Sequence, residues 1–425
     1  MIRRRLLTRK PLLTRKPLLI ALLALLAMST PRSHSQQLAL HEGDRVVFYG
    51  DSITAQRLYT RFVEDFVLTR YPQMQITFWN AGIPGDTVYG GYTGDMPARL
   101  KRDVLPHQPT VITIMLGMND GYYMAFNQKY LDIYKEGYSK LLDALQSEIP
   151  AARVTLISPT PYDEVTHGTE FAGYNEVISR HAAFVKELAA SSHRGFSDFN
   201  QVETDLLNGG TQKNSSLAAL LIPDRIHPAE ASHWVLAAAL ARSWGLSPIV
   251  SSVQLDAPLK KAGAAENTQV SDLTLKDGTL HWTQTDNALP LPLQLDDGMI
   301  QFVLSISGLE AMDQQLLRVN GLPAARYTLE IDGKKIASFA REQLATGVNL
   351  ALYSTPMENQ AKGVDGIEIK RTRLDEVRFL LAIEDPKTGN DAETLRALEA
   401  KDTALAEEQR RLAQPKPHRF ELSPE

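Results

Sequence analysis

Four short polar segments carry the residue types that an acyl-transfer reaction requires. Ser52 follows an apolar run and could act as a nucleophile, because its hydroxyl would lie where a buried strand ends. His227 could take the serine proton, and Asp224, three residues earlier, could orient the imidazole ring. The backbone N–H groups of Ser52 and Gly82 and the side-chain amide of Asn119 could stabilise a developing oxyanion. Together these residues predict hydrolysis of a carboxylic ester.

Each of these residues also has a purely structural explanation. Asp51 or Ser52 could cap the helix that follows the apolar run, since Asp and Ser are strongly preferred at helix N-caps. The Asp224 and His227 pair could be a surface pair, and Asn119 follows a Gly-Met step that is typical of a turn. The catalytic interpretation depends on all four segments occurring together, each at an expected strand end or loop.

An open α/β sheet is expected to position these segments. Between residues 45 and 245, short apolar runs alternate with longer amphipathic ones, which predicts a mostly parallel sheet with helices on both faces. The expected strands are Arg45–Tyr49, Gln75–Trp79, Thr110–Leu116, Arg153–Ile157 and a short one near Phe196. Apolar residues at helical spacing predict a helix over residues 128–147. The loops after the strands should therefore line one rim of the sheet.

At this point the sequence resembles the SGNH/GDSL hydrolase family. The segments that carry the resemblance are GDSIT at 50–54, NAGIPGDT at 80–87, GMND at 117–120 and DRIHP at 224–228. The resemblance covers residues 40–245 and implies a flavodoxin-like three-layer fold, a triad of Ser52, His227 and Asp224, and the oxyanion donors named above. It also implies action on carboxylic esters, such as lipid acyl groups or acetyl groups on polysaccharides. No metal or cofactor is required for that reaction.

Two rival functions use part of the same pattern. A metallophosphatase would use Asp51, Asn119, Asp120 and His227 as metal ligands, but the Asp-x-His and Gly-Asn-His strings expected of such a site are absent from the sequence. A non-catalytic carbohydrate-binding protein that has kept the fold stays open, although the complete set of catalytic residue types argues against it. Within the esterases, a lipase or lysophospholipase-type acyl hydrolase is the alternative.

The loops around the expected rim favour an acetylated carbohydrate as substrate. Gly90, Gly91 and Gly94 indicate an open, mobile loop rather than a deep acyl tunnel. Aromatic side chains near the strand ends could stack on sugar rings or pack internally. They are Tyr89, Tyr92, Tyr122, Tyr123 and Tyr162. The expected partner is therefore a small-molecule or polysaccharide ester.

The composition is that of a globular protein with more than one folded unit. The chain has 425 residues, of which 43% are hydrophobic and 22% are charged. A formal net charge of -5 and scattered aromatic residues argue against nucleic acid as a partner. The chain contains no cysteine, which excludes disulfides, thiolate metal sites and a thiol nucleophile.

The N-terminal residues predict export. Residues 1–36 begin with a basic segment, continue with the apolar run at 18–28 and end in small polar residues, which is typical of a cleaved signal peptide. The apolar run is too short to cross a bilayer comfortably, so no stable membrane span is expected after cleavage. The mature protein is predicted to be periplasmic or secreted.

Further modules are expected after the catalytic domain, which the pattern places at residues 37–249. Residues 250–268 are rich in Ser, Ala, Pro and Lys and predict a linker. Residues 269–345 alternate with period two, including Phe302, Leu304 and Ile306, and predict a small antiparallel β-sandwich-like module. Residues 346–425 predict a charged helical segment with a Pro-rich end.

Overall fold

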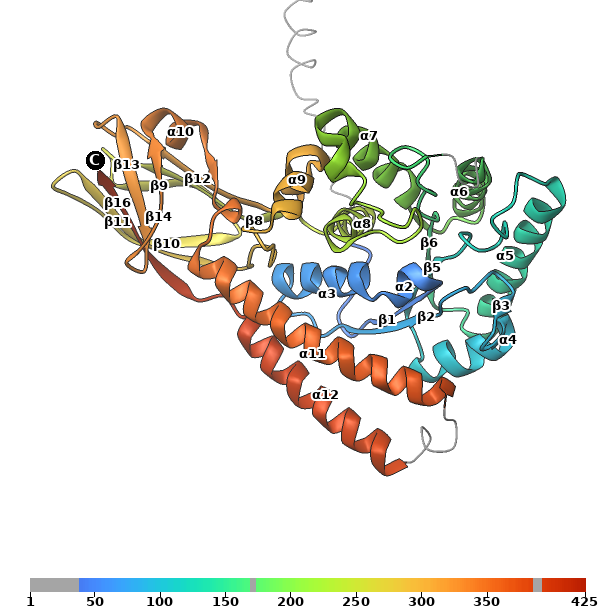
Figure 1. Cartoon of the computed structure of the whole chain (residues 1–425). Coiled ribbons are helices and arrows are strands. Elements are labelled where there is room, and N and C mark those ends of the chain that lie inside the picture. Colours follow the sequence, from blue (N-terminus) through green and yellow to red (C-terminus); the bar gives the residue numbers. More distant parts are fainter. Residues whose placement is uncertain (1–37, 169–172, 385–391) are drawn as a thin grey trace, which may run out of the picture. The chain divides into compact units, whose positions relative to one another are not determined.

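The computed structural model describes residues 38–168, 173–384 and 392–425 (Figure 1). The predicted signal peptide lies outside these residues. No helix in the part of the chain that the structure describes is long and apolar enough to cross a membrane. Within these ranges the buried apolar residues form three hydrophobic cores: one on each face of a parallel sheet, and a third inside the β-rich part that follows.

A five-stranded parallel sheet organises the first half of the chain. Its strands are β1 (Arg45–Gly50), β2 (Thr77–Gly82), β5 (Val111–Met115), β6 (Arg153–Ile157) and β7 (Gly195–Ser197). They lie in the order β2-β1-β5-β6-β7, and every neighbouring pair is parallel. This is the flavodoxin-like strand order, so the fold predicted from the sequence is confirmed, with strand ends displaced by a few residues.

Alternate side chains of β1 enter different cores. Val46 and Phe48 belong to the core on one face of the sheet, whereas Val47 and Tyr49 belong to the core on the other. Successive side chains of a strand point to opposite faces, so this apolar run must be covered on both sides. The covering helices are α3 (Leu58–Arg70), α7 (Phe199–Ala218) and α8 (Glu230–Ser243) on the first face, and α5 (Gln128–Glu148) with part of α6 (Tyr174–Ser191) on the second.

The glycine-rich segment near the rim is a short hairpin. The strands β3 (Gly90–Gly91) and β4 (Gly94–Asp95) pair antiparallel, so part of the segment that was predicted as an open loop is paired. Asp95 then caps α4 (Met96–Arg99) by accepting a hydrogen bond from the backbone N–H of Ala98 at 3.0 Å. The tight strand pairing explains the glycines, because a Cβ on Gly90 would lie 2.4 Å from a backbone oxygen.

The segment predicted as a linker, residues 250–268, forms strands instead. A four-stranded sheet has the order β15-β12-β8-β9. Its strands are β8 (Ile249–Asp256), β9 (Lys261–Glu266), β12 (Gln314–Asn320) and β15 (Val348–Asn349). Val250, Val253 and Leu255 on β8 are buried, and the serines between them hide this alternation in the composition. The β8 and β12 pair is parallel, an exception in a mostly antiparallel region.

A second, five-stranded sheet includes the last residues of the chain. Its order is β10-β11-β16-β13-β14. The strands are β10 (Thr268–Lys276), β11 (Thr279–Asp286), β13 (Arg326–Ile331), β14 (Lys334–Ala340) and β16 (Pro417–Pro424). Asp332 and Gly333, both with positive φ, join β13 to β14 in a two-residue hairpin turn. Strand β16 lies between β11 and β13 and buries Phe420 and Leu422, so the predicted Pro-rich end is an interior strand.

The alternation at residues 302–306 belongs to a helix rather than a strand. Helix α9 (Gly298–Ser307) begins after Asp297, whose side chain accepts hydrogen bonds from the N–H groups of Met299 and Ile300. Apolar residues occupy most positions of this segment, so period two and period 3.6 cannot be separated by pattern alone. The aspartate cap decides in favour of the helix.

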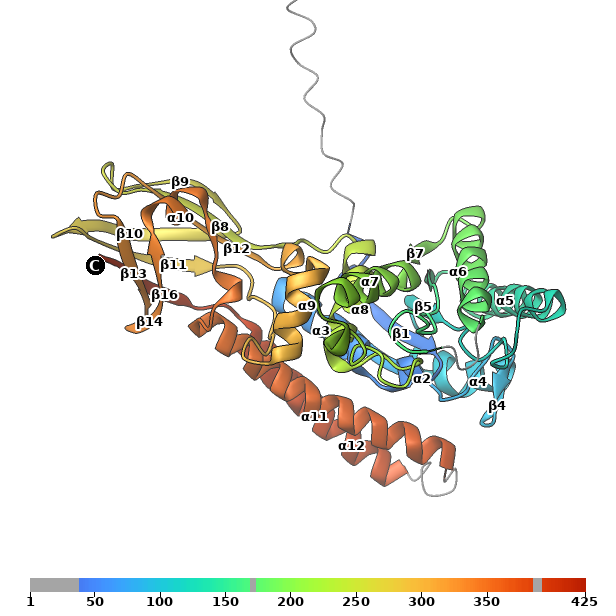
Figure 2. The same ribbon diagram turned by 45° about the horizontal axis from the view of Figure 1, so that its top comes forward.

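The charged C-terminal segment forms a helical hairpin, as the sequence predicted in part. Its helices are α11 (Pro356–Glu384) and α12 (Ala392–Ala413). Arg57 pairs with Asp375 of α11, and Arg61 of α3 lies 3.5 Å from Asp365. The hairpin therefore contacts α3 (Figure 2).

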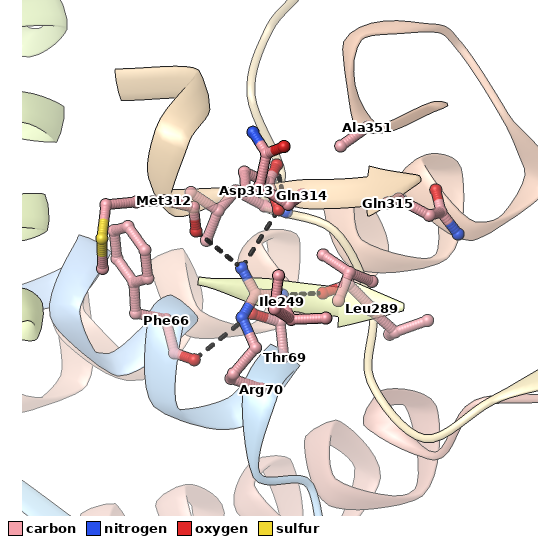
Figure 3. Close-up of polar contacts among 12 residues, drawn as sticks. Phe66, Thr69, Arg70, Ile249, Leu289, Met312, Asp313, Gln314, Gln315 and Ala351 are labelled. Atoms are coloured by element: carbon pink, nitrogen blue, oxygen red, sulfur yellow. Dashed lines mark hydrogen bonds and ion pairs between the residues drawn. The ribbon is translucent and has the colours of Figure 1, made fainter. Parts of the chain in front are cut away.

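Arg70, the last residue of α3, links the parallel-sheet part to the β-rich part (Figure 3). Its guanidinium donates to the carbonyl oxygens of Leu289 at 2.7 Å and Met312 at 3.2 Å, and to Asp313 Oδ1 at 3.0 Å. Asp313 Oδ2 accepts the backbone N–H of Leu291. Both charged side chains are almost completely buried. The pair therefore satisfies several backbone groups where these two parts of the chain meet.

Glu203 in α7 is a buried carboxyl group whose oxygens have no hydrogen-bond partner among the described residues. Burial, and secondarily the charge of Asp163, raises the pKa of Glu203 well above its usual value. As the pH rises above that usual value, the unfolded chain releases a proton that the folded protein keeps, so stability falls.

Replacing Glu203 with glutamine should remove this loss of stability, because the amide does not titrate. We expect the melting temperature of Glu203→Gln, relative to the wild type, to increase between about pH 5 and pH 8. Thermal scans at several pH values would measure it, with the exposed Glu187→Gln as the matched control. If the difference in melting temperature between Glu203→Gln and the wild type is the same at every pH, the raised pKa of Glu203 is contradicted.

Candidate active site

Ser52 lies directly after β1, as the first residue of the short helix α2 (Ser52–Ala55). The preceding residue, Asp51, caps this helix by accepting a hydrogen bond from the backbone N–H of Ile53 at 3.1 Å. The sequence left two roles open for this segment, a helix cap and a nucleophile, and the structure assigns the cap to one residue only. Asp51 is the cap, and the hydroxyl of Ser52 is left to contact His227.

The loop before α8 brings an imidazole and a carboxylate to Ser52. His227 Nε2 lies 2.8 Å from Ser52 Oγ, and His227 Nδ1 lies 2.6 Å from Asp224 Oδ2. Asp224 Oδ1 also accepts the backbone N–H groups of Ile226 at 3.0 Å and His227 at 2.7 Å. Partial burial opposes ionisation of Asp224, but these hydrogen bonds prevail and lower its pKa below the usual value. A carboxylate is thus held against the far side of the imidazole.

The backbone N–H of Gly82 is already used. It donates to Asn80 Oδ1 at 3.0 Å, inside β2, so the predicted role of Gly82 as an oxyanion donor is not supported by this geometry. A Cβ at Gly82 would lie 2.3 Å from the backbone nitrogen of Ala55, which explains why glycine is required there. Gly82 allows β2 to approach α2 closely.

Within the part of the chain that the structure describes, Gly85 of the same predicted motif has a backbone N–H that is free to donate, unlike that of Gly82. It is exposed, has a φ of +76°, and its N–H has no partner among the described residues. Its neighbour Pro84 lines the same cavity as Ser52 and His227. The sequence alone could not separate the two glycines, because both follow the strand predicted at residues 75–79 and belong to one motif.

Asn119 follows β5 and has both ends of its amide in contact with the protein. Its Nδ2 donates to the backbone oxygen of Asp86 at 2.9 Å, and its Oδ1 accepts from the hydroxyl of Tyr123 at 3.1 Å. The first bond ties the loop after β5 to the residue that follows Gly85. One hydrogen on Nδ2 is left to donate elsewhere.

Two carboxyl groups near the site serve as backbone acceptors. Burial raises the pKa of Asp51 and of Asp120 to about 7 in each case. Asp120 Oδ1 accepts the N–H of Val88 at 3.0 Å, much as Asp51 accepts that of Ile53. Across residues 38–168, 173–384 and 392–425, no group of three or more His, Asp or Glu side chains is arranged to hold a metal ion.

An open cavity of about 590 Å³ lies beside Ser52, Asp224 and His227. Most of its other lining residues are apolar, namely Ala55, Leu58, Pro84, Pro223, Pro228 and Ala229. Of the tyrosines predicted near the rim, Tyr92 and Tyr122 are 77% and 56% exposed. Tyr162 is buried and packs against Tyr123 and Tyr174, so of the two roles considered for it, internal packing applies.

The chain is similar to known proteins in three comparisons, which cover different lengths of the chain. Residues 48–235 match the model of the GDSL-like lipase/acylhydrolase family. An acetylxylan esterase from Geobacillus stearothermophilus is 27% identical over 226 residues, which cover 49% of this chain and 97% of that protein. The solved structure of a gut microbial diltiazem-metabolizing enzyme is 26% identical, with a TM-score of 0.79, and the match covers 91% of this chain and 98% of that one. The last likeness extends into the β-rich part.

Proposed function

We propose that this chain, which belongs to the GDSL-like lipase/acylhydrolase family and is a carboxylic ester hydrolase, acts through Ser52 as its nucleophile. The observation that carries the proposal is the continuous hydrogen-bond path from Ser52 through His227 to Asp224. A nucleophile in contact with a base, and a base oriented by a third group, is the arrangement that activates a serine hydroxyl.

The reaction then has two halves. Ser52 Oγ attacks the ester carbonyl while His227 Nε2 takes the serine proton, and the resulting imidazolium gives that proton to the departing alcohol. A water molecule, deprotonated by the same nitrogen, next attacks the acyl-serine and releases the carboxylic acid. Asp224 holds the imidazole in the required tautomer and stabilises the imidazolium.

The oxyanion donors in this proposal are the backbone N–H groups of Ser52 and Gly85 and the amide of Asn119. Gly85 replaces Gly82, whose N–H is already bonded. Asn119→Ala should lower kcat by about 10²- to 10³-fold with little change in KM, since a donor to the oxyanion acts in the transition state. Steady-state hydrolysis of p-nitrophenyl acetate would measure this.

The matched control for that variant is Asn127→Ala. Asn127 is exposed and caps α5, and its side chain contacts the N–H of Lys129 rather than the site. Its kcat should equal that of the wild type. Equal kcat values for the Asn119 and Asn127 variants would remove Asn119 from the proposed oxyanion hole.

The proposed substrate is a short acyl ester, such as an acetyl group on carbohydrate. The open cavity beside Ser52 supports this choice, as does the similarity to an acetylxylan esterase. A second candidate is a small-molecule ester, which the near full-length likeness to a diltiazem-metabolizing enzyme favours. We further propose that the protein is exported, as the N-terminal sequence predicts.

The test compares kcat/KM for p-nitrophenyl acetate and octanoate, together with acetate release from acetylated xylan and conversion of diltiazem. We expect the acetate to be preferred by at least about tenfold, a difference of roughly 1.4 kcal/mol between the transition states. Acetate release from xylan would favour the carbohydrate ester, and conversion of diltiazem alone would favour the second candidate. Preference for the octanoate would instead indicate a lipase-type hydrolase.

A further inference from the structure

We propose that Tyr123 is a positioning residue that holds the amide of Asn119 in the orientation an oxyanion hole needs. The inference rests on the proposed function, because it assumes that Asn119 donates to the oxyanion. Tyr123 itself touches neither the nucleophile nor the base in this proposal. It acts through Asn119 alone.

The two ends of the Asn119 side chain have opposite effects on an oxyanion. The NH₂ end stabilises the negative oxygen, whereas the carbonyl end would repel it, and the two ends have almost the same shape. The backbone oxygen of Asp86 can only accept, so it selects the NH₂ end at 2.9 Å. The hydroxyl of Tyr123 then donates to the carbonyl end at 3.1 Å. With both ends held, the second amide hydrogen has a fixed direction.

The hydroxyl of Tyr123 is the contact that holds the carbonyl end. Its donation also polarises the amide, because linked hydrogen bonds strengthen one another in a poorly solvated site. Burial, with smaller contributions from Asp51 and Asp224, raises the pKa of Tyr123 to about 12. The phenol therefore keeps its proton throughout the neutral range.

The backbone around Tyr123 has an unusual conformation that serves this contact. Tyr122 and Tyr123 both have positive φ, 55° and 54°, which non-glycine residues rarely adopt. The N–H of Tyr122 bonds back to the backbone oxygen of Asn119 at 3.1 Å. The chain thus turns sharply after Asn119. Tyr123, four residues further along, is thereby placed with its hydroxyl against the Asn119 amide.

Packing fixes the ring of Tyr123 in this place. It stacks on Tyr174, with ring centroids 4.9 Å apart, and Tyr174 Oη donates to the backbone oxygen of Met118 at 2.5 Å. Tyr174 belongs to α6, so the ring is supported by an element outside the loop. This contact gives the ring a structural role that is separate from the role of its hydroxyl.

Tyr123→Phe separates the two roles, because it keeps the ring and removes the hydroxyl. We expect kcat for p-nitrophenyl acetate to fall by roughly 3- to 10-fold with KM unchanged, the size of one lost hydrogen bond. Tyr130→Phe is the matched control, since this tyrosine contacts Tyr122 rather than Asn119, and its kcat should stay at the wild-type value. Melting temperatures would verify that both variants are folded.

A double-mutant cycle provides the decisive readout. In the Asn119→Ala background, Tyr123→Phe should change kcat by less than about twofold, because the side chain through which it acts is absent. A further fall of the original size in that background would overturn the proposal, since Tyr123 would then act independently of Asn119. An unchanged kcat for Tyr123→Phe in the wild-type background would also overturn it. If Asn119→Ala itself has no effect, the proposed oxyanion hole fails instead.

Discussion

Replacing Ser52 with alanine is expected to lower kcat for p-nitrophenyl acetate by at least about 10⁴-fold while the protein stays folded. Among the described residues, no other hydroxyl contacts His227 Nε2, so the variant has no second hydroxyl from which an acyl-enzyme could form. The remaining rate would come from the oxyanion donors and from substrate binding. Ser139→Ala is the matched control, because that hydroxyl bonds a carbonyl oxygen on the exposed side of α5.

A related prediction concerns the double variant of Ser52 and His227. In the proposed mechanism Ser52 and His227 act in one step, so the double variant Ser52→Ala with His227→Ala should be no slower than the slower single variant. If the rate losses of the two single variants multiply in the double variant, the two residues act separately. A Ser52→Ala enzyme within about tenfold of the wild type would exclude Ser52 as the nucleophile.

The second large effect is expected on stability, from Arg70→Ala. This change leaves the buried carboxylate of Asp313 and three backbone oxygens, those of Ser247, Leu289 and Met312, without their donor. Breaking such a buried pair typically costs about 3–5 kcal/mol. Burial already raises the pKa of Asp313 in spite of the attraction of Arg70, which shows how strongly this site disfavours a charge without its partner. Urea unfolding, followed by circular dichroism, would measure the loss.

Two further variants make that test specific. Arg326 pairs with Glu425 at the surface, so Arg326→Ala should leave the urea midpoint almost unchanged. Asp313→Ala should cost much less in the Arg70→Ala background than in the wild type, because the partner is already gone. Equal costs in both backgrounds would show that the two residues do not stabilise the fold as a pair.

The parallel sheet could be predicted from the sequence because its strands are continuous apolar runs. The run that contains Val46 to Tyr49 has to be buried on both faces, and Gly50 marks where it ends. The segments after β1, β2 and β5 were then expected at one edge, since parallel strands end together. This topology places Ser52 and Asn119 at the same edge, whereas His227 lies between the helices α7 and α8 and is brought to Ser52 by tertiary packing.

The β-rich part was harder to predict because its pairings are non-local. Strand β16 contains Pro417 and pairs with β11 and β13, which are far from it in the sequence, so no local pattern identifies it as an interior strand. The serines of β8 gave the composition of a linker, although its valines are buried. In α9, a mostly apolar segment matched both the strand period and the helix period, and the cap at Asp297 distinguishes them.

Within the site, the sequence could supply residue types but not hydrogen-bond partners. Gly82 and Gly85 belong to one motif, and only the contact with Asn80 shows that the N–H of Gly82 is already occupied. Tyr123 was one of several rim aromatics, and its distinct position depends on a left-handed turn that no propensity predicts for tyrosine. Tertiary geometry was needed in both cases.

Covalent labelling with a fluorophosphonate, followed by peptide mass mapping, tests the central claim most directly. We expect one equivalent of the phosphonyl group on the peptide that contains Ser52, loss of hydrolysis in parallel with labelling, and no labelling of Ser52→Ala. His227→Ala should label far more slowly, because the serine then has no base. A stoichiometric label on another residue, or full inactivation of the enzyme without modification of Ser52, would contradict the account.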